Sequence, residues 1–542
     1  MAENVLGALA DLQEESKPEP TAETNEAVSS LMKVETPNPT SVLFCGSADF
    51  AAAAKGASGK AQQKKDGANG EEFRAPVIIS SLNDKKVRYL SVGPSAGHVV
   101  ALTGDGTYVW GLNGNGQLGL GTKGGYVHPG PVRAKLWDID GDTPVAVAAG
   151  NRHTLMLYAS GTVLSCGAGD RAQLGLGHKG AALNDQNKPQ KVPLDNKIAC
   201  VAAGHDYSLC ASDEGALYSW GWSEYGKLGT GTDGSYNTRD SSIKITYTAT
   251  DISKVPVDGK IIQVSAGKHH AACLTDAGIG YTWGDNGYGK LGHRDQKQRN
   301  APTRVQGARF STLLCGDVST AGLGWPEYQG RPFSKQQGDG LVWVWGVLKG
   351  SNGEGATHPV PNYDVQGWSI DKANFALGGT HCALSGEGAG VAWAFSPVAF
   401  GQLGFGVNGV KSSHTANKMD VGEGLVARQV VASVGQTHLL VDTSSVTNVE
   451  TWEPPTEPLP APATKPRGPP PKKKAPKRKR PTRDPAAPLR RSKRDPTKTS
   501  EEKLSTCQGQ DTAEALARAL DEAALLAGDK APLIEKLAEK AR

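Results

Sequence analysis

The chain has 542 residues, of which 68 are glycine, 33 are proline and 38% are hydrophobic. Its eight cysteines are scattered without the C-x-x-C or paired-His spacing of a zinc site, and no stretch reaches the roughly 18 uninterrupted apolar residues of a membrane span. This composition argues against a metalloprotein and an integral membrane protein. We expect a reduced intracellular protein with no metal, no cofactor and no membrane contact.

Residues 1–40 are interpreted as a disordered, acidic segment. Glu3, Glu14 and Glu15 lie here, and no basic stretch precedes an apolar run, so a secretory signal is not predicted. The first expected strand is the apolar run Ser41–Gly46.

One phrase then recurs as far as residue 445. It consists of an apolar pair, Gly-x-x-His, an apolar strand, a Gly turn, a second strand ending in Trp-Gly, and a Gly-Gln/Lys-Leu-Gly turn, with its clearest copy from Val264 to Gly292. A spacing of about 50 to 60 residues suits four short strands and their turns. The phrase therefore predicts an all-β, seven-bladed β-propeller over residues 41–445. The seven copies start near Ser95, Gly150, Gly204, Gly267, Gly316, Gly378 and Gly435.

The two ends of this region complement one another. The seventh copy, Val430 to Asp442, has no Trp-Gly strand after it, whereas Ser41–Gly46 has no Gly-x-x-His before it. We predict that the N-terminal strand completes the seventh blade, which removes an open edge that would invite aggregation.

The phrase resembles the repeat of the regulator of chromosome condensation family. The insertion 231–259, the fifth copy without its Gly-Gln-Leu-Gly turn and Phe395-Ser396-Pro397 in place of Trp-Gly are similar to the family's second, centromere-associated branch. The resemblance implies a nuclear, chromosome- or centromere-associated propeller that binds proteins in chromosome or cell-cycle regulation, without covalent catalysis. The alternative it implies is a guanine-nucleotide exchange factor for a small Ras-superfamily GTPase.

Five histidines share one position of the repeat. Metal binding by these residues is disfavoured, because equivalent residues of different blades lie too far apart for one ion. We expect their imidazoles to hydrogen-bond backbone and lock adjacent blades together. They are His98, His153, His270, His381 and His438.

The position just before these histidines holds Arg152, Asp206 and His269 in successive blades. The family resemblance implies that Asp and His at this position contribute to nucleotide exchange, which makes Asp206 and His269 candidate GTPase contacts. We expect replacing either to leave thermal stability nearly unchanged. The other interpretation is that they are ordinary solvent-facing turn residues. Propeller faces and the insertion 231–259 are candidate surfaces for other proteins.

Two segments, Gly221–Lys227 and Gly284–Lys290, fit the phosphate-loop pattern G-x-x-x-x-G-K. The next residue is Leu228 or Leu291, however, and not the Ser or Thr that holds Mg²⁺. The match is explained by the repeat turn, so no nucleotide site is predicted.

Residues 446–510 are interpreted as a Pro-, Lys- and Arg-rich linker. Its segment 465–494 has fourteen Lys or Arg and the single acid Asp484, a charge of +13 that leaves −9 for the rest of a chain with total charge +4. Such a run suits nuclear import or contact with DNA phosphates, although a solvated linker without a partner is the alternative. The residues concerned are Lys472, Lys473, Lys474, Lys477, Arg478, Lys479 and Arg480.

Residues 511–542 form an Ala- and Leu-rich segment that predicts one or two helices for a partner that the sequence does not identify. Together these features predict a protein that is located in the nucleus and associated with chromosomes. An additional location in the cytoplasm is the alternative.

Overall fold

The computed structural model describes residues 39–50 and 71–460, except for residues 125, 241, 248, 329–330, 333–339, 350–353, 367, 369, 371–373, 387, 397, 399, 411 and 447. These residues belong to the first of two compact units, residues 1–464. The predictions for residues 1–38, for the basic run and for the helical segment 511–542 fall outside the described residues. Within the described ranges, no helix is long and apolar enough to cross a membrane.

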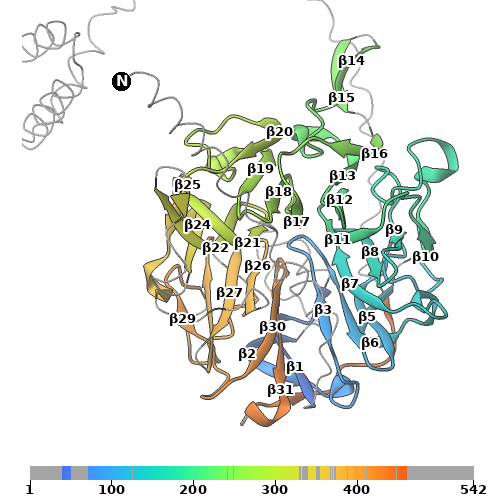
Figure 1. Ribbon diagram of the computed structural model, residues 1–542. Helices are drawn as coiled ribbons and strands as arrows, with labels where there is room; N and C mark the ends of the chain where they lie inside the picture. The colour runs from blue at the N-terminus through green and yellow to red at the C-terminus, as the bar shows by residue number, and fades with distance from the viewer. Residues whose placement is uncertain are drawn as a thin grey trace, which may run out of the picture. The chain divides into compact units, whose positions relative to one another are not determined.

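Seven antiparallel sheets form a ring, which confirms the predicted propeller (Figure 1). In blades 1 to 6 the strands follow chain order within each sheet. Blade 1 has β3 (Tyr89–Ser91), β4 (His98–Thr103), β5 (Gly106–Leu112) and β6 (Tyr126–Arg133), blade 2 has β7 (Pro144–Ala149), β8 (His153–Tyr158), β9 (Val163–Gly167) and β10 (Gln186–Lys191), and blade 3 has β11 (Ile198–Ala203), β12 (Tyr207–Ser212), β13 (Leu217–Trp222) and β16 (Ala249–Val255).

Blades 4 to 6 repeat this order. Blade 4 has β17 (Ile261–Ala266), β18 (His270–Thr275), β19 (Gly280–Gly284) and β20 (Arg299–Arg304), blade 5 has β21 (Ala308–Cys315), β22 (Ser319–Tyr328), β24 (Leu341–Lys349) and β25 (Glu354–Pro361), and blade 6 has β26 (Phe375–Leu377), β27 (His381–Gly386), β28 (Ala389–Ala394) and β29 (Asn417–Lys418). The short helical turns are 3-10 in type: Ser80–Leu82, Lys135–Trp137, Gly180–Leu183, Glu224–Gly226, Gly287–Gly289, Tyr363–Val365 and Thr443–Ser445.

Neighbouring blades pack through the first, second and third strands of each sheet. The second strands β4, β8, β12 and β18 are buried along their whole length, because both of their faces meet other blades. Tryptophans near the end of the third strand add a polar contact: the indole N–H of Trp220 donates to the Gln173 carbonyl, and that of Trp283 to the Lys227 carbonyl, both over 2.9 Å. The Trp-Gly signature thus marks a junction between blades.

Blade 7 is built from both ends of the ring sequence. Its first two strands are β30 (Ala427–Ala432) and β31 (Gln436–Asp442), and its outer two are β1 (Thr40–Ser47) and β2 (Glu72–Ile79). The pairing of β1 with β31 runs from Thr40↔Asp442 to Gly46↔Gln436. The predicted closure by the N-terminal strand is confirmed, and β2 is a second closing strand that the sequence did not reveal.

The chain continues to follow the ring after residue 445, so the predicted start of the linker at 446 is too early. Residues 449–460, here called the strap, include β32 (Thr451–Trp452), which pairs in parallel with β2, and β33 (Leu459–Pro460), which pairs with β6 of blade 1. The Trp452 ring lies 5.6 Å from that of Phe44 and 5.2 Å from that of Phe73. This apolar contact explains why the segment stays on the ring.

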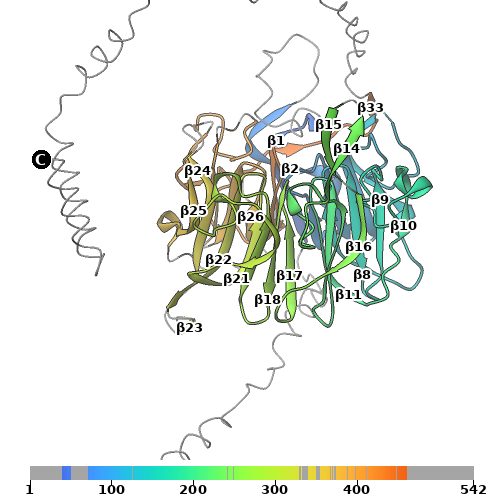
Figure 2. The same ribbon diagram turned by 90° about the horizontal axis from the view of Figure 1, so that it is seen from above.

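Two faces of the ring differ in the turns they carry. Because strands alternate in direction, the turn between the first and second strands and the connection between the third and outer strands emerge on the same face, here called the His-turn face. The insertion forms a hairpin, β14 (Ser235–Asp240) and β15 (Ser242–Tyr247), within the latter connection of blade 3. The extension at β23 (Arg331–Pro332) belongs to the opposite face, and Figure 2 shows the two pointing in opposite directions.

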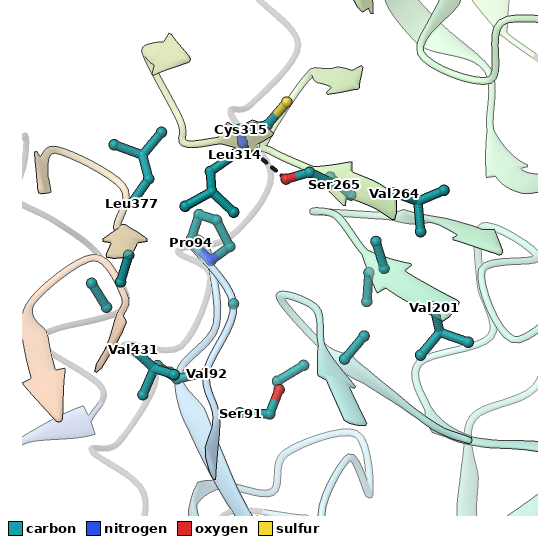
Figure 3. Close-up of a pocket in the computed structure, with 18 of the residues that line it drawn as sticks. Ser91, Val92, Pro94, Val201, Val264, Ser265, Leu314, Cys315, Leu377 and Val431 are labelled. Carbon is teal, nitrogen blue, oxygen red and sulfur yellow. Dashed lines mark hydrogen bonds between the residues drawn. The ribbon is translucent and has the colours of Figure 1, made fainter. Parts of the chain in front are cut away.

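The first strands of all seven blades line a narrow central channel of about 200 Å³ (Figure 3). The lining is mostly Val, Ala and Leu, and Pro94 projects into it from blade 1. Beside Pro94, the Ser95 hydroxyl donates to Asp317 of blade 5 over 2.6 Å. This contact joins blade 1 to blade 5 across one end of the channel.

Candidate protein-binding site on the His-turn face

Four of the five repeat histidines bridge adjacent blades through a hydroxyl, and not directly through backbone as predicted. His98 Nε2 lies 2.7 Å from the Thr154 hydroxyl, which donates to the Gln117 carbonyl over 2.7 Å. Since the hydroxyl proton is committed to the carbonyl, the ring must donate from Nε2. The other bridges are His153–Ser208 at 2.9 Å, His270–Thr320 at 2.9 Å and His381–Thr437 at 2.8 Å.

The histidine and the hydroxyl occur together or not at all. The partner position is the residue directly after the repeat position of the next blade. Where the repeat position of one blade is not His, the residue at the partner position of the next blade has no hydroxyl. Tyr207, for example, donates instead to the His270 carbonyl over 2.6 Å. The three such junctions combine Tyr207 with Ala271, Ser319 with Cys382, and Gln436 with Val99.

His438 does not occupy the repeat position, which corrects the sequence-based assignment. Gly46 pairs with Gln436, just as Gly111 pairs with His98 in blade 1, so Gln436 holds that position. His438 lies two residues further along, with its ring 5.0 Å from that of Phe44. The prediction was wrong because it took Gly435 as the first residue of the turn, whereas the turn in this blade begins at Ser433.

Asp206 and His269 lie in turns of adjacent blades on the His-turn face, as predicted, but Asp206 is not a free carboxylate. Its Oδ1 lies 2.6 Å from Nζ of Lys227, which is fully buried, while the Asp206 side chain is 13% exposed. Burial lowers the pKa of Lys227, and the Asp206 carboxylate opposes that shift. Lys227 is a site residue that the sequence interpretation treated only as part of a turn.

The repeat explains why a lysine needs a carboxylate here. In blade 1 the equivalent Gln117 accepts from the Asn115 N–H over 3.0 Å, and Gln173 and Gln402 make the same contact in their blades. An ammonium group cannot accept a hydrogen bond. Lys227 therefore pairs with Asp206, and in blade 4 Lys290 pairs with Asp285 at 2.5 Å. The residues two positions earlier, Tyr225 and Tyr288, have φ of 64° and 61°, which non-glycine residues seldom adopt.

His269 lies between these two ion pairs. Its ring centroid is 5.0 Å from that of Tyr225 and 5.9 Å from that of His205. Burial, followed by the positive charge of Lys227, lowers the pKa of His269 to about 3, and burial lowers that of His205 to about 4. Both imidazoles are therefore neutral at physiological pH. We call His205, Asp206, Lys227, Lys268, His269, Asp285 and Lys290 the blade 3–4 cluster.

The third residue at the candidate position, Arg152, is paired with Asp170 at 2.9 Å. Next to it, the Arg171 guanidinium lies 3.7 Å from the centroid of the Trp222 ring, a stacked cation–π contact. Among the residues that the structure describes, no group of three His, Cys, Asp or Glu side chains is placed to hold a metal ion. This part of the face offers charged and aromatic groups suited to binding a protein.

Comparison with known proteins identifies the family of this chain. The regulator of chromosome condensation (RCC1) repeat matches residues 105–157, 160–211, 214–274 and 278–323. The zebrafish (Danio rerio) protein RCC2 homolog is 30% identical over 393 residues, which cover 69% of this chain and 74% of that protein. The chain belongs to the RCC1-repeat family. Human RCC2 is 28% identical to this RCC1-repeat protein over 388 residues, 69% of this chain and 70% of human RCC2.

Solved structures support the fold of this RCC1-repeat protein. Human WBSCR16 superposes with a TM-score of 0.58 at 20% identity over 74% of this chain and 99% of its own. Yeast RCC1 (Prp20), solved with Kap60 bound, gives a TM-score of 0.58 at 17% identity over 75% and 89% of the two chains. At these identities the likeness concerns the propeller architecture alone.

Proposed function

We propose that this RCC1-repeat protein is a nuclear, chromosome- or centromere-associated scaffold that binds proteins through its propeller faces in chromosome or cell-cycle regulation. The observation that carries the proposal is the 30% identity to an RCC2 homolog over 69% of this chain. The charged and aromatic blade 3–4 cluster is a suitable binding surface, and no covalent chemistry is needed. Proteins cross-linked to the tagged full-length chain in nuclei should include chromosomal proteins, and their absence would overturn this assignment.

The basic run Lys472–Arg480 is proposed to drive nuclear import and to contact DNA phosphates. If about six charges neutralise phosphates, affinity for DNA should fall about a thousandfold between 50 and 200 mM salt. Replacing Lys477, Arg478, Lys479 and Arg480 by Ala should flatten this dependence and reduce nuclear accumulation, measured by DNA-binding titrations and by imaging. Unchanged location and DNA retention in this variant would reject both roles.

A second candidate function is guanine-nucleotide exchange on a small Ras-superfamily GTPase. The structure of the yeast relative Prp20p was reported with its binding properties to Gsp1p and histones. In the present chain, Asp206 and His269 lie on one face in adjacent blades. An exchange factor works by binding the nucleotide-free GTPase more tightly than the loaded one, which couples two binding equilibria.

Exchange is tested by release of labelled GDP from a panel of such GTPases. We expect His269→Asn to slow release about tenfold, a loss of about 1.4 kcal/mol in transition-state stabilisation. Asp206→Ala is unsuitable, because it would leave the buried Lys227 charge unpaired at a cost of about 3–5 kcal/mol. The expectation that replacing Asp206 leaves thermal stability nearly unchanged therefore does not hold for Asp206→Ala.

The matched variant for Asp206 is Asp206→Asn combined with Lys227→Gln. This pair restores the glutamine of blades 1, 2 and 6 and removes both charges, so it should fold while lacking the carboxylate. Release slowed by the pair would assign the contact to the Asp206–Lys227 ion pair, whereas normal release would exclude Asp206 as a contact. If no GTPase of the panel responds to saturating propeller, the exchange function is wrong and the scaffold proposal stands.

A further inference from the structure

The outer strands of the blades are protected at one shared position, here called the edge position. In the third strand, the residue two positions before the Trp-Gly glycine or its equivalent pairs with a residue of the outer strand, and the edge position directly precedes that partner. Five blades have proline at the edge position, and proline has no N–H to offer to a further strand. They are Pro131, Pro189, Pro302, Pro359 and Pro76, in blades 1, 2, 4, 5 and 7.

Blades 3 and 6 lack this proline. In blade 6 the N–H of Ala416 donates to Asp364 over 3.2 Å, and the outer strand β29 has only two residues. In blade 3 the edge position is Ile252, in the seven-residue strand β16. Its N–H donates over 3.0 Å to the carboxylate of the preceding residue, Asp251, which also lies 3.3 Å from Nδ1 of His178. Both of these side chains are exposed, so a ligand can displace this cap, whereas it cannot displace a proline.

Two other blades already have an added strand at the rim of the ring. The strap adds β33 to β6 of blade 1 and β32 to β2 of blade 7. Each added strand pairs with only two residues, Tyr126 and Val127 in β6 and Ile78 and Ile79 in β2, and neither pairing includes the proline. The rim of a blade therefore accepts an extended segment. In blade 3 the described residues leave β16 without a strand on its outer side and without the proline.

The outward-facing groups of β16 indicate which strand would fit. Proline at the edge position of the other blades implies that the N–H there points away from the sheet, and outward groups alternate along a strand, so those of Ile252 and Lys254 face outward. Asp251 and Lys254 are exposed, and their side chains lie on opposite sides of the strand. Opposite charges in directly facing positions stabilise paired strands. An antiparallel partner strand with an acidic residue, two others and then a basic residue matches both charges.

A second copy of β16 does not meet this requirement. In a closed dimer with two-fold symmetry, antiparallel copies of one strand pair residues whose numbers differ by an even number, because directly facing side chains lie on the same side of the sheet. Asp251 would then face residue 251, 253 or 255 of the other copy and never Lys254. The charges of β16 therefore favour a segment of a different protein.

We propose that the outer edge of β16 in blade 3 binds an extended acidic-x-x-basic segment of a partner protein, which adds to the blade as an antiparallel fifth strand. The incoming backbone replaces the Asp251 carboxylate at the Ile252 N–H. Its acidic and basic side chains then pair with Lys254 and Asp251. The site lies on the rim of the ring, apart from the faces to which the proposed function assigns binding, so the two proposals can fail separately.

The test uses the full-length chain and two capped, fluorescently labelled peptides of the same composition. Thr-Glu-Thr-Val-Lys-Thr has the matching order of charges, and Thr-Lys-Thr-Val-Glu-Thr is the matched control with equal net charge. Fluorescence anisotropy should show at least tenfold tighter binding of the first peptide. In the chain labelled with ¹⁵N at isoleucine, the Ile252 amide signal, assigned by its loss in Ile252→Val, should shift with the first peptide alone. No binding, or equal binding of both peptides, would overturn the proposal.

Substitutions in β16 place the peptide on the strand edge. Ile252→Pro copies the five protected blades, so the ring should fold, and binding of the first peptide should weaken at least tenfold. Ile252→Val keeps the N–H and should weaken binding less than twofold, which separates loss of the N–H from loss of the side chain. If Ile252→Pro does not fold, the double variant Asp251→Lys with Lys254→Asp decides the matter, because it exchanges two exposed charges and should prefer the second peptide.

Two results with these variants would contradict the proposal. Binding that survives in folded Ile252→Pro would mean that the peptide lies away from the edge of β16. A charge-exchanged variant that still prefers the first peptide would mean that Asp251 and Lys254 do not face the added strand.

Discussion

Deletion of residues 39–47 is expected to abolish soluble folding of the ring. All eight residues of β1 are buried, and the strand lies between β31 and β2 in blade 7. Leu43 and Phe44 alone contribute roughly 1.5–3 kcal/mol each by burial, a large part of a typical total stability of about 5–15 kcal/mol. The deletion also leaves two long strand edges unpaired, which favours aggregation.

The measurements are the soluble fraction after expression and the thermal unfolding of whatever remains soluble. The matched control deletes residues 2–38, which leaves all of the described strands in place and should preserve both quantities. If the shorter chain without β1 melts like this control, the closure of blade 7 is not needed for stability.

Acidification from pH 7 to pH 5 is expected to destabilise the propeller strongly. Burial lowers the pKa of His98 and His153 to about 3 and that of His381 to about 4, from the ordinary value of 6.5. Below pH 6.5 the unfolded chain takes up protons that the folded ring excludes, so stability falls with pH until the folded values are reached. Below pH 6.5 each such histidine lowers the free energy of unfolding by about 1.4 kcal/mol per pH unit, which amounts to about 2 kcal/mol at pH 5.

Urea unfolding followed by tryptophan fluorescence at pH 7, 6 and 5 measures this loss. The double variant His98→Gln with Thr154→Val copies the Gln436/Val99 junction and should therefore fold. It should lack the part of the pH dependence of the free energy of unfolding that His98 contributes. A free energy of unfolding that is constant between pH 7 and pH 5 would show that these imidazoles remain protonatable in the folded ring.

The repeat spacing was sufficient to predict seven blades and the N-terminal closing strand, because each blade reproduces one local pattern of turns and alternating strands. The pattern could not reveal β2, whose sequence Glu72–Ile79 has none of the repeat's glycines, or the strap, which is held by Trp452 packing on Phe44 and Phe73. Both depend on contacts between segments that are distant in the chain.

The candidate site was predicted only in part for a similar reason. Repeat position placed Asp206 and His269 on one face, since equivalent turns of a ring point the same way. Lys227 was missed because a lysine in a glycine-rich turn is usually exposed, and its burial depends on Asp206 from another turn. Gln436 was missed because Gly435 imitates the repeat's glycine, whereas Ser433 begins the turn.

Blade 7 also determines when the ring can form during synthesis. The Ser41 and Thr443 hydroxyls lie 2.9 Å apart in the finished fold, but 402 positions separate the two residues along the chain. At about 5–20 residues per second, β1 leaves the ribosome roughly 20–80 s before the strand that it pairs with. During this interval the apolar run Val42–Cys45 can pair with β2 alone. The edge of β1 that later pairs with β31 stays open, so the nascent chain depends on chaperones or on rapid folding of the middle blades to cover that edge.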